Sequence, residues 1–341
     1  MTGSPPAFSN TADAPNVSVI VPIYNGAQDM EALGTCLLAQ TIAPATVEFL
    51  LVDNNSQDHT PQLLQSWADQ AREQGFHVKV LLEAEIQSSY AARNRGIRSA
   101  SGEILVFTDA DCRPEPTWLA NMVQPFEDSQ VGLVVGEIKA LPGDSLLEAY
   151  AEHRETLSQK FTIAHSFYPY GQTANLAVRR VAFAKAGLFR PYLTTGGDAD
   201  LCWRVQLSGP WQLQFAADAV VRHRHRATLK ELANQWRRYG RSNRYLHELY
   251  GVPLQPPLTF RKAAYLVTRW GLKGLPSTLW QVLQGKAAAV QLICQPLDLF
   301  CGRSRDLGQA QAQLSEPARA IEWLGHPPSP EELKALSVRI D

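Results

Sequence analysis

Two aspartates one residue apart, Asp109 and Asp111, directly follow an apolar segment at 103–108 (EILVFT). Carboxylates with this spacing can reach one hard cation together, and Mg²⁺ or Mn²⁺ usually needs only one or two of them beside substrate phosphates. Such a cation would neutralise the charge of a departing diphosphate. The plainer alternative is an acidic turn after a strand, but the place directly behind a buried strand favours a metal site.

Two further polar groups suit the binding of a nucleotide. Asp53 opens the polar turn 53–58 (DNNSQD), and its carboxylate could accept a hydrogen bond from a base or ribose, although Asp and Asn favour turns in any case. Arg93 lies early in a helical segment before 103–108. Its planar guanidinium could bind a diphosphate or a base, unless it belongs to a solvated helix face.

A candidate base follows a pair of glycines in the segment 196–200 (GGDAD). Glycine lets a backbone approach a ligand closely, so Gly197 is a candidate ligand contact. Asp198 could then deprotonate an acceptor hydroxyl as a general base. Asp200 suits the first turn of a helix, where an acidic residue has an ordinary structural role, and is otherwise a candidate acceptor contact.

Histidine and arginine alternate in the segment 222–226 (RHRHR), which ends a predicted strand. Because the two histidines alternate, we expect them to point to opposite faces of an extended segment, so that at most one of His223 and His225 faces the site, where it could complete a metal shell or hold phosphate. The arginines, Arg226 among them, suit a diphosphate or an anionic lipid surface, or are simply solvated.

The elements that must position these residues alternate along the first hundred residues. We predict strands at 17–24, 47–53, 78–82 and 103–108 and helices at 28–39, 61–71 and 88–99. This alternation is typical of a parallel sheet with helices on both faces. Right-handed crossovers put the carboxyl ends of the strands along one edge, where ligands bind in open α/β sheets. Asp53, Asp109 and Asp111 fall at that edge.

The later part of the chain is more mixed. We predict strands at 131–138, 173–178 and 212–221, helices at 180–186 and 200–207, and a long helix from 228. The domains follow from this pattern: a disordered leader at 1–16, a catalytic domain at 17–250 and a helical C-terminal extension at 251–341. The catalytic domain divides into a nucleotide-binding half at 17–120 and an acceptor half at 121–250.

Composition limits the choice of function classes. The 341 residues are 45% hydrophobic and 19% charged, which leaves material for a substantial core, and a net charge of -1 provides no global field toward nucleic acid. Five cysteines without a Cys-x-x-Cys pair argue against structural zinc and a disulfide framework, so we expect a reducing, cytoplasmic compartment. We find neither a signal peptide nor a secure membrane span.

Taken together, the motifs resemble those of the family 2 glycosyltransferases, which have the GT-A fold. The matching segments are VSVIVPIYN, LLVDNNSQDHT, AARNRGI, SGEILVFTDADC, ANLAVRR, GGDADLCWR and HRHRATLKELANQWRRYGR, from about 17 to 244. The resemblance implies an α/β fold with a Rossmann-like, mostly parallel central sheet flanked by helices. It also implies a nucleotide-diphosphate sugar donor, a divalent cation (Mn²⁺ or Mg²⁺) and inversion at the sugar carbon.

The resemblance also implies roles for single residues. Pro22, Tyr24 and Asp53 would line the nucleotide pocket with Arg93 beside them. Asp109 and Asp111 would hold ribose, metal and diphosphate, and Asp198 would be the catalytic base. His223 or His225 would be the late metal or diphosphate ligand, and we favour His225 slightly. Two departures stand out: Asp53-Asn54 replaces the two acids of many relatives, and Gly197-Asp198 replaces the usual Glu-Asp pair. The first leaves base preference open, although we favour a UDP-sugar.

The segment after Tyr250 combines apolar, basic and Trp residues. Such helices could lie in a membrane interface, as a lipid-linked acceptor would require, or could pack on the catalytic domain or a second subunit. We hold these readings equal, so contact with the inner face of a membrane is an open expectation.

Three rival functions remain. A nucleotidyltransferase would carry a Gly-rich, arginine-containing loop where this chain has PIYNG, and a glycoside hydrolase needs two carboxylates flanking one bond. An inactive nucleotide-sugar-binding protein would not need Asp109, Asp111 and Asp198 together.

Overall fold

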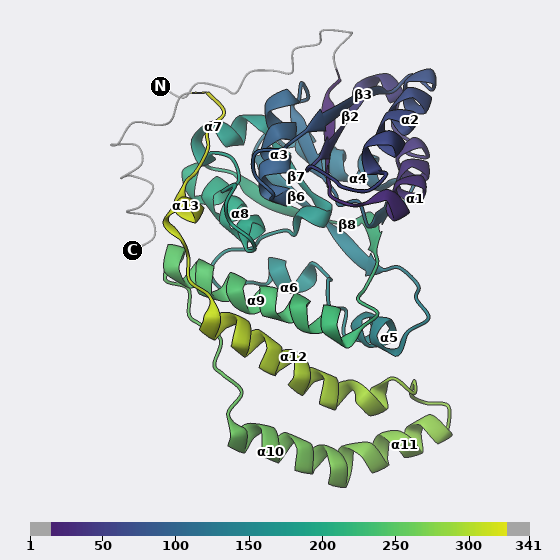
Figure 1. Ribbon diagram of the computed structural model, residues 1–341, viewed down its shortest axis with the longest axis vertical. Helices are drawn as coiled ribbons and strands as arrows, with labels where there is room; N and C mark the ends of the chain where they lie inside the picture. The colour runs from purple at the N-terminus through teal and green to yellow at the C-terminus, as the bar shows by residue number, and fades with distance from the viewer. Residues whose placement is uncertain (1–14, 326–341) are drawn as a thin grey trace. The chain divides into compact units, whose positions relative to one another are not determined.

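The computed structural model describes residues 15–325, so the first 14 residues of the predicted leader lie outside the described part (Figure 1). The chain forms two compact units. Among the described residues, the sheet unit consists of 15–139, Ser158–His223 and 316–325, and the helical unit of Ala140–Leu157 and Arg224–Ser315. This division differs from the predicted boundary at 250, because the long helix after 228 packs with the C-terminal helices.

One half of the eight-stranded sheet is parallel, as the alternating pattern predicts. Its strands are β1 (Val17–Ile23), β2 (Val47–Asp53), β3 (His77–Leu82) and β4 (Ile104–Phe107). β1 pairs with both β2 and β4, and β2 pairs with β3. All residues of β1, β2 and β4 are buried, which explains why these strands are mostly apolar. The loops after β1, β2 and β4 therefore open at one edge.

The other half of the sheet is antiparallel where its pairings are resolved. The strand order is β3-β2-β1-β4-β7-β6-β8-β5, with β5 (Cys112–Pro114), β6 (Val131–Ala140), β7 (Leu176–Arg179) and β8 (Gln212–His223). β7 runs antiparallel to both β4 and β6, and β5 runs antiparallel to β8. The predicted α/β class is confirmed, and the three parallel pairs, β1–β2, β1–β4 and β2–β3, lie among the first four strands in this order.

Helices of the sheet unit connect these strands. They are α1 (Ala27–Leu38), α2 (Thr60–Glu73), α3 (Ser89–Ser99), α4 (Trp118–Val123), α6 (Lys160–Ile163), α7 (Phe183–Ala186), α8 (Gly197–Ser208) and α13 (Glu316–Arg319). Short 3₁₀ turns lie at Pro44–Thr46, Gln124–Glu127, Thr173–Asn175 and Arg180–Ala182. α3 packs on β1 and β2, which places its side chains near the loop edge of the parallel half.

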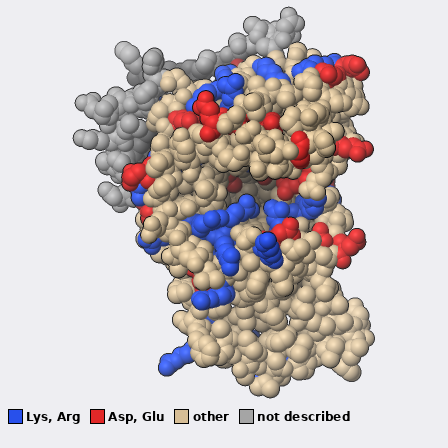
Figure 2. All heavy atoms as spheres, in the orientation of Figure 1, with Lys and Arg blue, Asp and Glu red and all other residues tan. Residues whose placement is uncertain are grey.

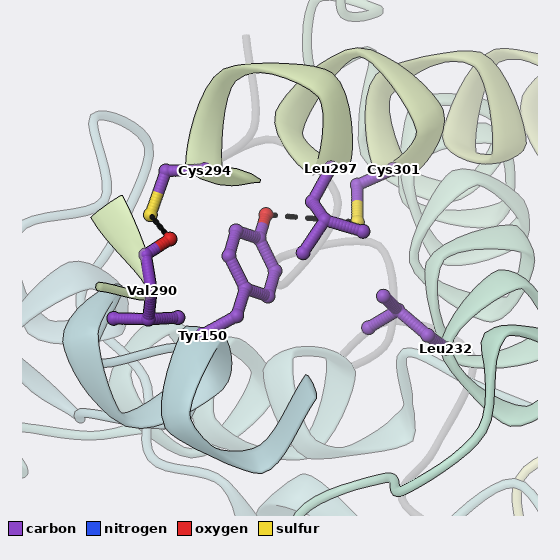
Figure 3. Close-up of a cluster of buried hydrophobic side chains, with 6 residues drawn as sticks. All are labelled: Tyr150, Leu232, Val290, Cys294, Leu297 and Cys301. Carbon is purple, nitrogen blue, oxygen red and sulfur yellow. Dashed lines mark hydrogen bonds between the residues drawn. The ribbon is translucent and has the colours of Figure 1, made fainter. Parts of the chain in front are cut away.

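The helical unit is built on two long helices that run side by side (Figure 1). It contains α5 (Leu146–His153), α9 (Leu229–Tyr250), α10 (Phe260–Arg269), a π-helical turn (Trp270–Gly274), α11 (Leu275–Leu283) and α12 (Gln291–Gln311). Its apolar core joins α5, α9 and α12 (Figure 3), with Tyr150, Leu232, Val290, Cys294, Leu297 and Cys301. The Tyr150 hydroxyl donates to the Asp298 carboxylate at 2.8 Å.

Within the helical unit, α10 and α11 contact α12, and neither helix has a buried residue. Among residues 15–325, no helix is both long enough and apolar enough to cross a bilayer. All five cysteines are free.

Candidate active site

The loops after β1 and β2 are tied together by side chains. Asn25, which has a positive φ of 48°, accepts a hydrogen bond from the Gln57 backbone at 2.8 Å, and its own backbone N–H donates to Ser56 at 2.9 Å. Asp53 lies opposite Ile23 at the end of the β1–β2 ladder and accepts a hydrogen bond from the Ser56 N–H at 3.2 Å. The carboxylate is therefore buried and oriented by its own turn.

The predicted nucleotide residues differ in exposure. Tyr24 is 52% exposed beside this loop pair, so its ring is accessible to a ligand. Pro22 is buried within β1, where it lies opposite Val52. Of Tyr24 and Pro22, only the tyrosine ring is open to solvent.

Arg93 is the most constrained charged residue of the site. Its guanidinium donates to Asp109 at 2.6 Å, while the side chain is 4% exposed. The rings of Tyr90 and Phe189 stack on each other, with centroids 5.5 Å apart, and both lie within 6 Å of the guanidinium carbon. The Arg93 Nε is buried and makes no hydrogen bond to any described residue. The positively charged Arg93 guanidinium is thus held in place beside Asp109.

The second aspartate faces a histidine across a short strand pair. Cys112 in β5 lies opposite His223 in β8, and this register brings the His223 Nε2 to 3.3 Å from the Asp111 carboxylate. The Asp111, Cys112 and His223 ligand atoms lie within 4.8 Å of one another. Burial raises the pKa of the Cys112 thiol well above its ordinary value, so it is neutral at pH 7 and a poor ligand for a hard cation.

Asp198 lies in the first turn of α8, half-buried, and its carboxylate accepts a hydrogen bond from the Thr173 hydroxyl at 3.0 Å. Burial raises the pKa of this carboxyl, the positive charge of Arg93 lowers it and the negative charge of Asp109 raises it. These three side chains therefore form one electrostatic group. A carboxylate with a raised pKa is a stronger base than an ordinary aspartate.

Two neighbours of Asp198 have structural roles in this geometry. Asp200 is fully buried, and its two oxygens pair with Arg190 and Arg204, both at 2.8 Å, which holds its pKa at about 2. Its side chain neither caps α8 nor is open to an acceptor, so the predicted acceptor contact does not fit this geometry. A Cβ on Gly197 would lie 2.6 Å from the Tyr90 ring, so the glycine admits an aromatic ring there.

The two histidines of 222–226 share a buried side while Arg222, Arg224 and Arg226 are partly exposed. The prediction that the two histidines point to opposite faces is therefore wrong, because alternate residues of an extended chain lie on one face. The structure brings His223 to Asp111, whereas His225 and Arg226 belong to the helical unit. The family resemblance favoured His225, and the β5–β8 pairing that brings His223 to Asp111 gives no local signal in the sequence. Sequence reasoning also missed Thr173, Tyr90 and Phe189.

Comparison with solved structures supports the predicted class of fold. A mannosyltransferase from Pyrobaculum calidifontis, solved with GDP-Man and Mn²⁺, superimposes with a TM-score of 0.59 at 19% identity, covering 87% of this chain and 88% of that one. The likeness shows the fold: a GT-A type α/β sheet. The class of fold is therefore that of the GT-A proteins, and the class of activity comes from the comparison of sequences.

Comparison of sequences gives the family. The model for "Glycosyl transferase family 2" matches residues 18–190. The glycosyltransferase AglE of Haloferax volcanii is 33% identical over 234 residues, 67% of this chain and 73% of that protein. The pre-mycofactocin glycosyltransferase of Mycobacterium tuberculosis is 26% identical over 325 residues, 90% of this chain but 65% of that longer protein. The chain belongs to glycosyltransferase family 2.

Proposed function

We propose that the protein is an inverting, metal-dependent glycosyltransferase that moves a sugar from a nucleotide-diphosphate donor to a hydroxyl of a glycan or a lipid-linked acceptor. The observation that carries this proposal is one electrostatic group: a half-buried Asp198 with a raised pKa, beside the Arg93–Asp109 pair. Family membership supports the transferase activity. Metal dependence and inversion rest on the side chains.

The donor site would lie at the carboxyl edge of the parallel half-sheet. Tyr24 and Asp53 would contact the base or ribose, because Tyr24 directly follows β1 and Asp53 is the last residue of β2. Pro22, buried within β1, would lie behind them. Asp109 and Arg93 would contact the ribose or diphosphate. A UDP-sugar remains our favoured donor, and GDP-mannose is the named alternative because a protein of the same fold was solved with it.

A divalent cation fits the pair of aspartates. Asp111 and His223 offer an oxygen and a nitrogen on neighbouring strands, and Asp109 offers a second carboxylate two residues earlier. An imidazole in the donor set suits Mn²⁺ better than Mg²⁺, so we expect Mn²⁺ to be the stronger activator. The cation would supply positive charge for the leaving diphosphate. A metal role for His225 stays a prediction.

The chemistry of this chain's own residues would centre on Asp198. Its carboxylate would take the proton of the acceptor hydroxyl while that oxygen forms a bond to the anomeric carbon. The bond from this carbon to the diphosphate oxygen breaks on the opposite face, which inverts the configuration. Thr173 holds the carboxylate in place, and Arg93, fixed by Tyr90, Phe189 and Asp109, would keep positive charge near the departing group.

Peripheral contact with a membrane is the second part of the proposal. Phe260, Leu272, Trp280 and Leu283 are 64–87% exposed on α10, the π-helical turn and α11. No Asp or Glu occurs between Glu248 and Asp298, whereas Arg and Lys do, and Figure 2 shows no acidic side chain over α10 and α11 on this face. Exposed aromatic and aliphatic groups beside cations suit an anionic lipid interface.

The test is a donor screen on the purified full chain with Mn²⁺ or Mg²⁺. Each UDP-, GDP- and dTDP-sugar is supplied, and nucleoside diphosphate release is followed with and without a chelator. We expect one donor to give release that is lost with the chelator and in Asp198→Asn. Release of pyrophosphate instead would identify a nucleotidyltransferase. If no nucleoside diphosphate or donor bound the protein with metal present, the proposal would be wrong.

A further inference from the structure

Charge is unevenly divided between the two units, although the whole chain carries only -1. The helical unit contains fifteen Lys and Arg residues against eight Asp and Glu, a formal net charge of +7. Figure 2 shows Lys and Arg side chains gathered over α9. Some of these side chains line a defined pocket.

One stripe of α9 carries three arginines with helical spacing. Positions 234, 237, 238 and 241 fall on one face of the helix, because residues three, four and seven apart are neighbours there. Together with two residues of α12 they line a pocket of about 520 Å³. The lining residues are Asn234, Arg237, Arg238, Arg241, Gly308 and Gln311. All are polar or lack a side chain.

Two glycines let the helix backbones meet beside this pocket. A Cβ on Gly308 would lie 2.1 Å from the Arg237 carbonyl oxygen, and one on Gly240 would lie 1.9 Å from the Arg305 carbonyl oxygen. Neither contact could be relieved by rotating a side chain, because both involve backbone atoms. The close crossing of α9 and α12 therefore fixes where the arginine stripe stands.

No acid within residues 15–325 neutralises this stripe. Arg237, Arg238 and Arg241 take part in no ion pair across that range, and the Nε of Arg241 is buried without a hydrogen-bond partner there. The acids of α9 and α12 are engaged elsewhere. Glu231 bonds Thr228, Glu248 pairs with Arg244, Asp298 pairs with Arg154 and Asp306 pairs with Arg305. A buried, unpartnered donor of a charged group is costly unless a ligand satisfies it.

We propose that this arginine pocket binds a phosphate-ester or diphosphate group. Guanidinium groups hold phosphate oxygens through paired, charge-assisted hydrogen bonds, and three on one helix face can surround a single tetrahedral anion. Asn234 and Gln311 add neutral donors to the lining. The phosphate could belong to a lipid headgroup or to a soluble ester. The proposal does not rest on the transferase activity, because the site lies in the helical unit and uses neither donor nor metal.

The test measures binding of inorganic pyrophosphate to the full chain by calorimetry, with a chelator present to keep metal out of the catalytic residues. Arg241→Gln removes the guanidinium whose Nε is buried without a partner, and Arg241→Lys keeps the charge but loses the planar donors. Arg303→Gln is the matched control, because Arg303 is exposed on α12 outside the pocket. We expect Arg241→Gln to weaken binding about tenfold, Arg241→Lys to weaken it less, and the control to bind as the wild type does.

Equal losses in Arg241→Gln and Arg303→Gln would mean general charge attraction, and no loss in Arg241→Gln would mean another site; either result overturns the proposal. Sedimentation with phosphatidylcholine vesicles, with or without phosphatidylglycerol, then identifies the source. A loss of phosphatidylglycerol-dependent sedimentation in Arg241→Gln, beyond that of the control, assigns the pocket to a lipid headgroup. Unchanged sedimentation with weakened pyrophosphate binding assigns it to a soluble ester.

Discussion

The hydrogen bond from Thr173 to Asp198 should set the acid limit of the reaction. The hydroxyl donates to the carboxylate at 3.0 Å, while the Thr173 backbone N–H reaches the other oxygen only at 3.4 Å. Thr173→Val keeps the shape but removes the shorter bond, which stabilises the ionised form. A hydrogen bond to a charged group contributes roughly 1.5–3 kcal/mol, and one pKa unit equals about 1.4 kcal/mol. The pKa of Asp198 should therefore rise by about one unit or more.

The sign of the effect on rate follows from the role of the base. Asp198 must be ionised to accept a proton, so activity falls as pH drops through its pKa. Burial already raises this pKa in the wild type, and Thr173→Val raises it further. The acid limb of kcat/KM should move to higher pH by about one unit, while the plateau above both pKa values keeps most of its height.

The assay is nucleoside diphosphate release at saturating metal across the acid range, with kcat/KM fitted at each pH. Thr35→Val is the matched control, because the Thr35 hydroxyl bonds the Glu31 carbonyl on an exposed part of α1. The control should leave the profile unchanged. If the limb of Thr173→Val coincided with that of the wild type while Asp198→Asn was inactive, the acid limb would belong to another group. The reasoning from this hydrogen bond would then be wrong.

Further predictions concern metal, stability and helix crossing. His223→Ala should raise the Mn²⁺ concentration needed for half-maximal activity about 10–100-fold, and an unchanged requirement would exclude this histidine as a ligand. Asp200→Asn should lower the free energy of unfolding in urea by roughly 3–5 kcal/mol, because it leaves two buried arginines without their carboxylate. In the wild type the pKa of Asp200 is about 2, below the value of about 3.9 in the unfolded chain. This difference stabilises the folded protein by roughly 2–3 kcal/mol above pH 4. The stabilisation is lost as pH falls toward 2, which is observable as acid unfolding. Gly308→Ala should destabilise the helical unit and weaken pyrophosphate binding, since its Cβ meets the Arg237 backbone, whereas Gly302→Ala, whose nearest neighbour is 3.9 Å away, should do neither.

The residues at the carboxyl edge of the parallel sheet were predictable from the sequence. The strands that precede Asp53 and Asp109 are fully buried, so continuous apolar runs mark them and their ends. A strand end together with right-handed crossovers is enough to place a side chain at the ligand edge. The prediction of β2 agrees with the structure at both ends, at Val47 and Asp53.

Contacts that depend on antiparallel or helix–helix pairing were not predictable in the same way. β5 has only three residues, too few for a periodic signal, yet its register with β8 decides that His223 meets Asp111. The sequence placed Asp200 in the first turn of α8 but could not show that Arg190 would fold back onto it. Long-range partners of this kind are determined by tertiary packing, which a local sequence pattern does not reveal.

The net charge of the chain conceals an uneven distribution of charge between its two units. A net charge of -1 excludes a global field, yet the helical unit carries +7 and the remainder of the sequence must carry -8. Such a division is hard to explain by solubility alone, because a near-neutral total gives little colloidal benefit. It is understandable if the two units bind different partners: the acidic edge of the sheet a metal-bound donor, and the basic helices a phosphorylated ligand or an anionic surface. On this view, removing pocket arginines should alter anion binding while leaving the metal requirement of the sheet unit unchanged.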